Sequence, residues 1–346
     1  MDISAAPFLG GGQPVMSNYV PVLDEPLFLA GLVVFGVGFG LVTLRALAAP
    51  ARVGRALGGV DAQRFGVNAA AVSAAIALAA FAWSWLALPD RLGGQRYYEL
   101  LFWGGGHVLQ FTWTLLMLVA WLWLATLAGL RLALGPRVAA LLFGVALAAV
   151  FATPAIYLAW PVTSLEHRSL FTWLMRFGGG LAILPIGLAL VVGLARAGRA
   201  SADARPLRAA LWASLALFAA GGAIGFMIKG SDVRVPAHYH GSIVGVTLAL
   251  MGLAYALAPR LGLGRPSPRL ATVQPLLYGG GQLLHILGLV WSGGYGVQRK
   301  VAGSAQVLRT TEEVIGMGVM GIGGLIAVIG GVLFVVVIAR AMLRRA

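Results

Sequence analysis

Apolar runs of twenty or more residues recur from Pro26 to the end of the chain. A helix needs about 20 residues to cross the roughly 30 Å hydrocarbon layer of a bilayer, and nine runs are that long. Strand-length alternation of apolar and polar residues is missing, and a backbone in lipid must satisfy its own hydrogen bonds, so each run is predicted to be helical. The nine predicted spans are 26–49, 64–89, 97–130, 137–160, 168–195, 206–229, 236–259, 271–293 and 312–340.

The composition agrees with an all-α polytopic membrane protein. Hydrophobic residues make up 60% of the chain and charged residues only 10%, whereas soluble domains carry about 25% charged residues. The chain has no cysteine, which excludes a disulfide framework. Residues 1–25 hold three acids and no basic residue, unlike a cleavable signal. We expect 1–25 to form an outer N-terminal segment and 26–346 a single transmembrane helical bundle.

The positive charge of the chain is a topology signal. Its 25 basic residues outnumber its 11 acids, for a net charge of +14. Sixteen of the basic residues and only two acids lie in the loops after the odd-numbered spans, and the other loops balance. Basic loops stay in the cytoplasm, so we expect a bacterial-type inner membrane protein with its N-terminus outside and its C-terminus in the cytoplasm. This distribution needs no nucleic-acid partner.

The histidines gather at one depth, near the outer ends of the predicted spans. Ionisable residues at membrane depth usually mark function, and neutral imidazole is a common ligand of metals and heme iron. Residues two apart on a helix are rotated by about 200°, so a His-x-His pair faces two sides and can serve two centres. The alternative is that the histidines of such a pair hydrogen-bond to lipid headgroups or loops and bind no metal or heme. The five histidines are His107, His167, His238, His240 and His285.

Four blocks of sequence resemble the catalytic subunit (subunit I) of heme–copper oxidases, with the B-type branch closest. The run Val235-Pro-Ala-His-Tyr-His240 is similar to the start of the family's tenth helix. Leu101–His107 and Trp160–His167 are similar to its sixth- and seventh-helix motifs, and Leu284–Leu289 with Gln298–Lys300 to its eleventh. The resemblance covers nearly the whole chain but starts late, so the nine spans would correspond to helices four to twelve.

The resemblance implies two hemes. His238 would be the axial ligand of the high-spin, gas-binding heme, and His240 one axial ligand of the low-spin, electron-donating heme. Arg299 and Lys300 would contact the heme propionates by charge-assisted bonds, with Asp232 in the same region. His285 has a non-ligand histidine as its counterpart.

The resemblance also implies a non-heme metal, iron or copper, bound by His107 and His167. Glu166 stands beside His167 where the family has a second histidine, which would make a set of two histidines and one carboxylate. Such a set suits non-heme iron, whereas an imidazole-rich set suits copper. The alternative for Glu166 is an outer-loop acid paired with Arg168.

Two further departures bear on function. No histidine precedes His107, so the second ligand of the low-spin heme is expected on a small membrane subunit that carries the missing N-terminal helices; otherwise this heme is absent or differently ligated. Phe111 stands where oxygen-reducing members place a redox-active tyrosine, and Tyr157 is a candidate substitute.

These departures favour the reduction of NO to N2O, which needs only two electrons and no O–O cleavage. Reduction of O2 to water by a cytochrome c oxidase is the alternative. A heme-b electron-transfer subunit without a dinuclear centre and a cofactor-free transporter stay open. The resemblance implies that an outer-side cupredoxin or c-type cytochrome donates the electrons.

Overall fold

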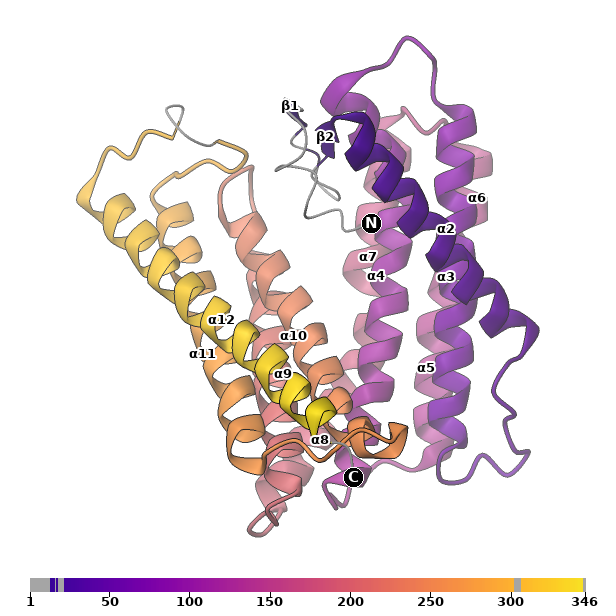
Figure 1. Ribbon diagram of the computed structural model, residues 1–346. Coiled ribbons are helices and arrows are strands. Elements are labelled where there is room, and N and C mark those ends of the chain that lie inside the picture. Colours follow the sequence, from indigo (N-terminus) through magenta and orange to yellow (C-terminus); the bar gives the residue numbers. More distant parts are fainter. Residues whose placement is uncertain (1–12, 16, 18–21, 302–305, 345–346) are drawn as a thin grey trace. The chain divides into compact units, whose positions relative to one another are not determined.

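The computed structural model describes residues 13–15, 17, 22–301 and 306–344, and most of them are helical (Figure 1). The predicted N-terminal segment, 1–25, lies largely outside these residues, apart from a two-stranded antiparallel ribbon. The elements are β1 (Gln13–Val15), β2 (Val22–Asp24), α2 (Pro26–Ala48), α3 (Asp61–Ala87), α4 (Gly94–Leu127), α5 (Pro136–Val150), α6 (Ala152–Ala159), α7 (Leu165–Gly178), α8 (Gly180–Arg196), α9 (Ala204–Met227), α10 (Arg234–Leu257), the 3-10 turn η2 (Ala258–Leu261), α11 (Pro268–Gly294) and α12 (Thr311–Leu343).

Helices coincide with all nine predicted spans. The fourth span is built from α5 and α6, and the fifth from α7 and α8. Within the described residues, eight segments are long and apolar enough to cross a membrane. The helix α11 is not one of them, because Gln274, Gln282 and His285 lower its hydropathy. The all-α, multi-pass fold is confirmed.

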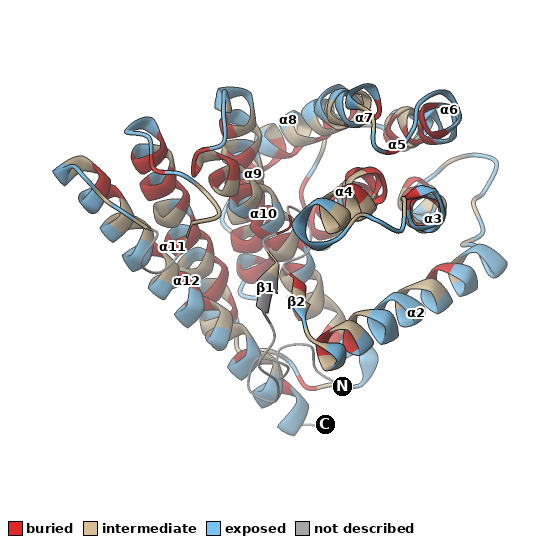
Figure 2. Cartoon of the chain, turned by 90° about the horizontal axis from the view of Figure 1, so that it is seen from above, coloured by how far each residue is buried: buried red, intermediate tan, exposed pale blue. Residues whose placement is uncertain are grey.

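The ends of the helices follow from local sequence. Proline occupies the first turn of α2, α5 and α11, where its missing N–H costs nothing. The Glu25 carboxylate caps α2 by accepting the Phe28 N–H at 2.8 Å. Thr310 and Glu313 form a capping box at the start of α12. Most of α2 is exposed (Figure 2), as expected of a helix whose apolar side chains face lipid.

The helices divide into two compact units. The first contains the residues up to Val119 together with Leu134–Ile186, and the second contains Ala120–Ala133 together with Gly187 onward. The core of the first unit includes Phe111, Tyr157 and Phe171. The core of the second includes apolar residues of α9, α10 and α11. The single bundle expected from sequence stays a prediction.

Within the second unit, α11 and α12 lie side by side (Figure 1). A row of glycines on α12 contacts α11. Gly316, Gly323 and Gly330 are seven residues apart, so they share one face of α12. A Cβ at Gly323 would overlap the backbone nitrogen of His285 on α11. Small residues of this kind let helix backbones approach closely in lipid.

We expect Gly323→Val to separate α11 from α12 and to destabilise the protein by about 1–3 kcal/mol, the usual cost of overpacking. Thermal unfolding of the purified protein measures this loss. The matched control is Gly321→Val on the same helix, where an added Cβ meets no atom within 4 Å. Equal losses in the two variants would show that helix propensity, not packing, sets the cost.

Candidate heme and metal site

His107 and His167 lie close together in the first unit, inside one aromatic cluster. His107 on α4 is 2% exposed and His167 on α7 is fully buried. Both imidazole rings pack on Phe171, with centroid distances of 6.2 Å and 4.9 Å. Two histidines from motifs sixty residues apart in sequence are thus brought together by the packing of α4 and α7.

The hydrogen bonds of the two rings suit metal ligands. His107 Nδ1 lies 2.7 Å from the Trp103 carbonyl oxygen, which assigns the proton to Nδ1 and the lone pair to Nε2. Ligating histidines usually donate their other N–H to such an acceptor. Neither ring nitrogen of His167 has a hydrogen-bond partner in the described structure, although both are buried. Burying such nitrogens without a partner is costly, and a bound metal ion would accept the lone pair of one of them. The two histidines therefore fit the non-heme metal that the sequence predicts.

Glu166 lies apart from this buried pair. Its side chain is exposed in the first turn of α7. No group of three His, Cys, Asp or Glu residues in the described ranges could hold one metal ion. The structure therefore brings together two of the three predicted metal ligands. The alternative Glu166–Arg168 ion pair is not formed either, since the Arg168 guanidinium lies over the Trp103 ring, 4.9 Å from its centroid.

Tyr157, the candidate substitute for the missing tyrosine, lies against the His167 ring. Their centroids are 4.8 Å apart and the rings stand at 87°. The Tyr157 hydroxyl donates to the Ala80 carbonyl at 3.0 Å and lies 2.7 Å from the Ser84 hydroxyl. Phe111, by contrast, is an ordinary apolar member of the core. Ser84 was not predicted from the sequence, although its position as a serine inside an alanine-rich span could have indicated a role.

In the second unit, His238 and His240 project from α10 toward different helices. His238 Nδ1 lies 2.7 Å from the Gly221 carbonyl oxygen of α9, which leaves Nε2 as the ligating nitrogen. A Cβ at Gly225 would lie 2.9 Å from this Nδ1, so the glycine makes room for the ring. The exposed His240 has its ring centroid 4.7 Å from that of His285 on α11. The two faces expected from the spacing are therefore present.

His285 is held on α11 by the neighbouring helix. Its Nδ1 lies 2.9 Å from the Met320 carbonyl oxygen of α12. This bond fixes the ring that contacts His240, in keeping with the structural role expected of His285.

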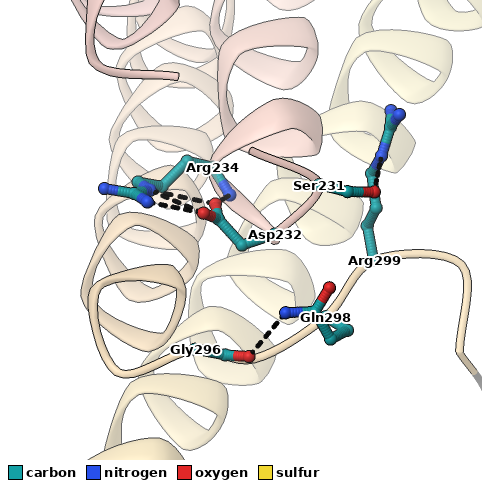
Figure 3. Close-up of polar contacts among 6 residues, drawn as sticks. All are labelled: Ser231, Asp232, Arg234, Gly296, Gln298 and Arg299. Atoms are coloured by element: carbon teal, nitrogen blue, oxygen red, sulfur yellow. Dashed lines mark hydrogen bonds and ion pairs between the residues drawn. The ribbon is translucent and has the colours of Figure 1, made fainter. Parts of the chain in front are cut away.

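Asp232 and Arg299 are brought near each other by pairing between two loops (Figure 3). Asp232 and Gln298 form an antiparallel bridge between the α9–α10 loop and the α11–α12 loop. Arg299 donates from its backbone to the Ser231 carbonyl at 3.4 Å and from Nε to the Ser231 hydroxyl at 3.3 Å. Lys300 adopts a φ of 60°, a left-handed conformation that non-glycine residues adopt mainly where the surrounding structure enforces it.

The buried Asp232 carboxylate holds the side chain of Arg234, the first residue of α10. Arg234 Nε lies 2.9 Å and 3.1 Å from the two carboxylate oxygens, and its terminal nitrogen lies 2.5 Å from one of them (Figure 3). These hydrogen bonds, above all, lower the pKa of Asp232. Because the folded pKa lies below the unfolded value, the pair stabilises the protein at neutral pH. That contribution is lost as the pH falls through the folded pKa.

We expect Asp232→Asn to cost about 1–3 kcal/mol of unfolding free energy at pH 7, because Arg234 loses a charged, partly buried partner. The difference from the wild type should shrink once the pH falls below about 4. Thermal unfolding measured from pH 7 downward tests this. Asp61→Asn is the control, because it breaks the exposed Asp61–Arg64 pair, which is worth about 0–1 kcal/mol. A difference in stability between Asp232→Asn and the wild type that does not change with pH would show that the charge of Asp232 does not stabilise the protein.

Comparisons with known proteins agree with these motifs. Residues 3–333 match the family model described as "Cytochrome C and Quinol oxidase polypeptide I". An uncharacterized protein of Rickettsia prowazekii (strain Madrid E) is 29% identical over 384 residues, which covers 96% of this chain and 72% of the relative. An uncharacterized protein of Aquifex aeolicus (strain VF5) is 30% identical over 264 residues, which covers 75% of this chain and 63% of the relative.

The fold also has a counterpart among solved structures. A cryo-EM structure of a heme-copper terminal oxidase dimer aligns with a TM-score of 0.62 and 17% sequence identity. The alignment covers 82% of this chain and 56% of that chain, so the likeness concerns the fold of a little over half of it. Since the family model spans almost the whole sequence, the chain belongs to the cytochrome c and quinol oxidase polypeptide I family, within the heme–copper oxidase superfamily.

Proposed function

We propose that this chain is the catalytic core of a respiratory gas reductase, in which a low-spin heme passes electrons to a high-spin heme and a non-heme metal. The observation that carries the proposal is the buried His167, whose two ring nitrogens lack partners beside His107. Most buried polar atoms are hydrogen-bonded, so an imidazole with two unpaired nitrogens needs an explanation, and a bound metal ion supplies one. Family membership supports the same conclusion.

Each histidine has a part in this proposal. His107 and His167 would hold the metal, iron or copper, His238 the high-spin heme and His240 the low-spin heme. These groups, when bound, would supply electrons and a Lewis acid for the gas. The carbonyls of Trp103 and Gly221 keep the proton on Nδ1 of His107 and His238. The packed rings of Tyr157 and Phe171 keep bulk water away from His167.

Asp232, Arg299 and Lys300 form the proposed propionate region. Arg299 supplies a guanidinium suited to a carboxylate, and the bridge between the two loops fixes its backbone. Asp232 acts through Arg234, which it holds in place. The Arg234 side chain keeps 23% of its surface exposed, which leaves part of the guanidinium open to a carboxylate.

We propose O2 as the substrate and keep NO as the second candidate. The sequence favoured NO because Phe111 replaces a tyrosine and Glu166 could ligate iron. Two observations support O2 instead: Tyr157 contacts His167, and Glu166 is exposed. Reduction of O2 to two waters takes four electrons and four protons, and a neighbouring phenol can supply one of each when the O–O bond breaks. The case for NO still rests on Phe111.

Tyr157→Phe tests the choice of substrate. The variant keeps the ring that packs on His167 and removes only the hydroxyl, so we expect O2 consumption to fall by at least about a hundredfold. Consumption of NO should change by less than about threefold, because two-electron chemistry does not draw on the phenol. Oxygen and NO electrodes with an artificial electron donor measure both rates.

The control is Tyr255→Phe, which removes another buried hydroxyl, bonded to Gln274 at 2.9 Å in the second unit. Its O2 rate should stay close to the wild-type rate. An O2 rate unaffected by Tyr157→Phe, or equal losses in both variants, would remove Tyr157 from the reaction. A wild-type protein that consumes NO and not O2 would make NO the substrate.

The proposed partners are an outer-side cupredoxin or c-type cytochrome that donates electrons and a small membrane subunit that carries the second low-spin heme ligand. The exposure of His240 on α10 supports a ligand from outside this chain. The distribution of basic loops supports an N-terminus outside and a C-terminus in the cytoplasm. A purified complex whose other chains carry no intramembrane histidine would contradict the second partner.

A further inference from the structure

A cavity of about 540 Å³ lies in the second unit, at the end of its helices that the charge distribution assigns to the cytoplasm. The loop after α4, the last turn of α8 with the residues after it, and the start of α9 form its walls. Three of its lining residues are arginines and none is acidic. These arginines are Arg131, Arg196 and Arg208.

Arg208 lines this cavity, and two backbone carbonyls orient its guanidinium. Its two terminal nitrogens donate to the carbonyls of Gly198 and Ala128, at 2.6 Å and 3.2 Å. Its Nε is buried and has no partner in the described structure. An unmet buried donor costs free energy. Arg208 therefore lines the cavity with an oriented guanidinium, one donor of which lacks an acceptor.

The surroundings of the cavity strengthen its positive potential. Arg131 and Arg196 are exposed, and Arg199 and Arg205 follow close by in the sequence. Asp203 is the one acid between residues 187 and 231, and it forms no ion pair within the described residues. Guanidinium groups bind phosphate oxygens in bidentate fashion, so a phosphate is the acceptor that this cluster suits best.

An apolar strip leads away from the arginines along α8. Leu188 and Val191 are 66% and 38% exposed, and the exposed Ala195 continues their face to the turn that holds Arg196. A ligand with a phosphate at one end and a hydrocarbon chain at the other fits this arrangement. Free phosphate would use only the arginines. The cavity is also larger than one phosphate needs and falls within the range of about 300–1,000 Å³ usual for small-molecule sites.

We propose that this cavity binds the phosphate headgroup of an anionic phospholipid, with Arg131, Arg196 and Arg208 on the headgroup and the acyl chain along Leu188 and Val191. Basic pockets between membrane helices at the cytoplasmic side are a known setting for such lipids. The site is independent of the heme and metal residues, so it can be tested without turnover.

The test uses the purified full-length protein in neutral detergent and measures its thermal unfolding during titration with phosphatidylglycerol or phosphatidylcholine in mixed micelles. We expect phosphatidylglycerol to raise the unfolding temperature and phosphatidylcholine to have little effect. The double variant R131A/R196A removes two exposed side chains, so it should fold normally. Its apparent affinity for phosphatidylglycerol should be about thirtyfold weaker.

The matched control is R260A/R265A, which removes two exposed arginines outside the cavity. It should keep the wild-type affinity, and equal weakening in both double variants would show a non-specific surface effect and overturn the proposal. Inorganic phosphate forms a second arm. If phosphate alone stabilises the protein as much as phosphatidylglycerol does at equal concentration, the ligand is a free anion and the lipid assignment is wrong.

Discussion

Replacing His167 with phenylalanine is expected to remove the non-heme metal and to lower gas reduction at least about a hundredfold, without unfolding the protein. His167 is fully buried, and neither of its ring nitrogens bonds to the described chain. Phenylalanine preserves the ring contacts with Tyr157 and Phe171 and removes a buried polar group that has no partner. Such an exchange is neutral or stabilising in the absence of a ligand.

This variant separates a metal ligand from a histidine that merely packs. Metal analysis, heme content and thermal unfolding of metal-depleted samples are the measurements. The expected result is background metal, unchanged heme and an unfolding temperature equal to or above that of the metal-depleted wild type. His285→Phe is the control: it should keep the metal but lose about 1 kcal/mol, because its hydrogen bond to the Met320 carbonyl is removed. Full metal content in His167→Phe would end the ligand assignment.

The second large effect concerns the two histidines of α10. We expect His238→Leu to lose the high-spin heme and the ability to bind CO, and His240→Leu to lose the low-spin heme while CO still binds. The reason is that His238 is oriented by Gly221 on α9, whereas His240 contacts His285 on α11. Pyridine hemochrome and CO-difference spectra of the two variants report these losses separately. Loss of both hemes in each variant would show one shared site, which the two-sided arrangement does not allow.

A smaller change on α9 checks the same assignment without touching a ligand. A Cβ at Gly225 would lie 2.9 Å from His238 Nδ1. Gly225→Ala should therefore tilt the ring and shift the CO-difference spectrum while heme content stays intact. Gly222→Ala on the same helix, where a Cβ meets no atom within 4 Å, should leave the spectrum unchanged.

The sequence predicted the helices and the sides on which the key histidines of α10 lie. Length and hydropathy are properties of each segment alone, so all nine spans coincide with helices. The 200° between His238 and His240 is a property of one helix, and the two rings accordingly contact α9 and α11. The family resemblance placed Asp232 and Arg299 in one region, whereas the pairing of their two loops came only from the structure, since no local pattern relates residues so far apart.

What sequence could not supply is the packing between helices. Tyr157 meets His167 only because α6 ends close to the start of α7, with Ser84 and Ala80 of α3 orienting the hydroxyl. Glu166 is next to His167 in sequence but about 100° away around the helix, so burial of one ring leaves the carboxylate exposed. The ion pair of Asp232 with Arg234 was not predicted, because the burial of Asp232 cannot be read from a short polar stretch.

The stoichiometry of heme and non-heme metal in the purified full-length protein decides whether this chain is a gas reductase. We expect a high-spin heme together with about one equivalent of iron or copper outside heme, and loss of that metal in His167→Phe. Heme without non-heme metal would contradict the gas-reductase assignment and leave an electron-transfer subunit. A protein that contains no heme would contradict every function proposed for the histidines of α10 and would exclude both heme roles.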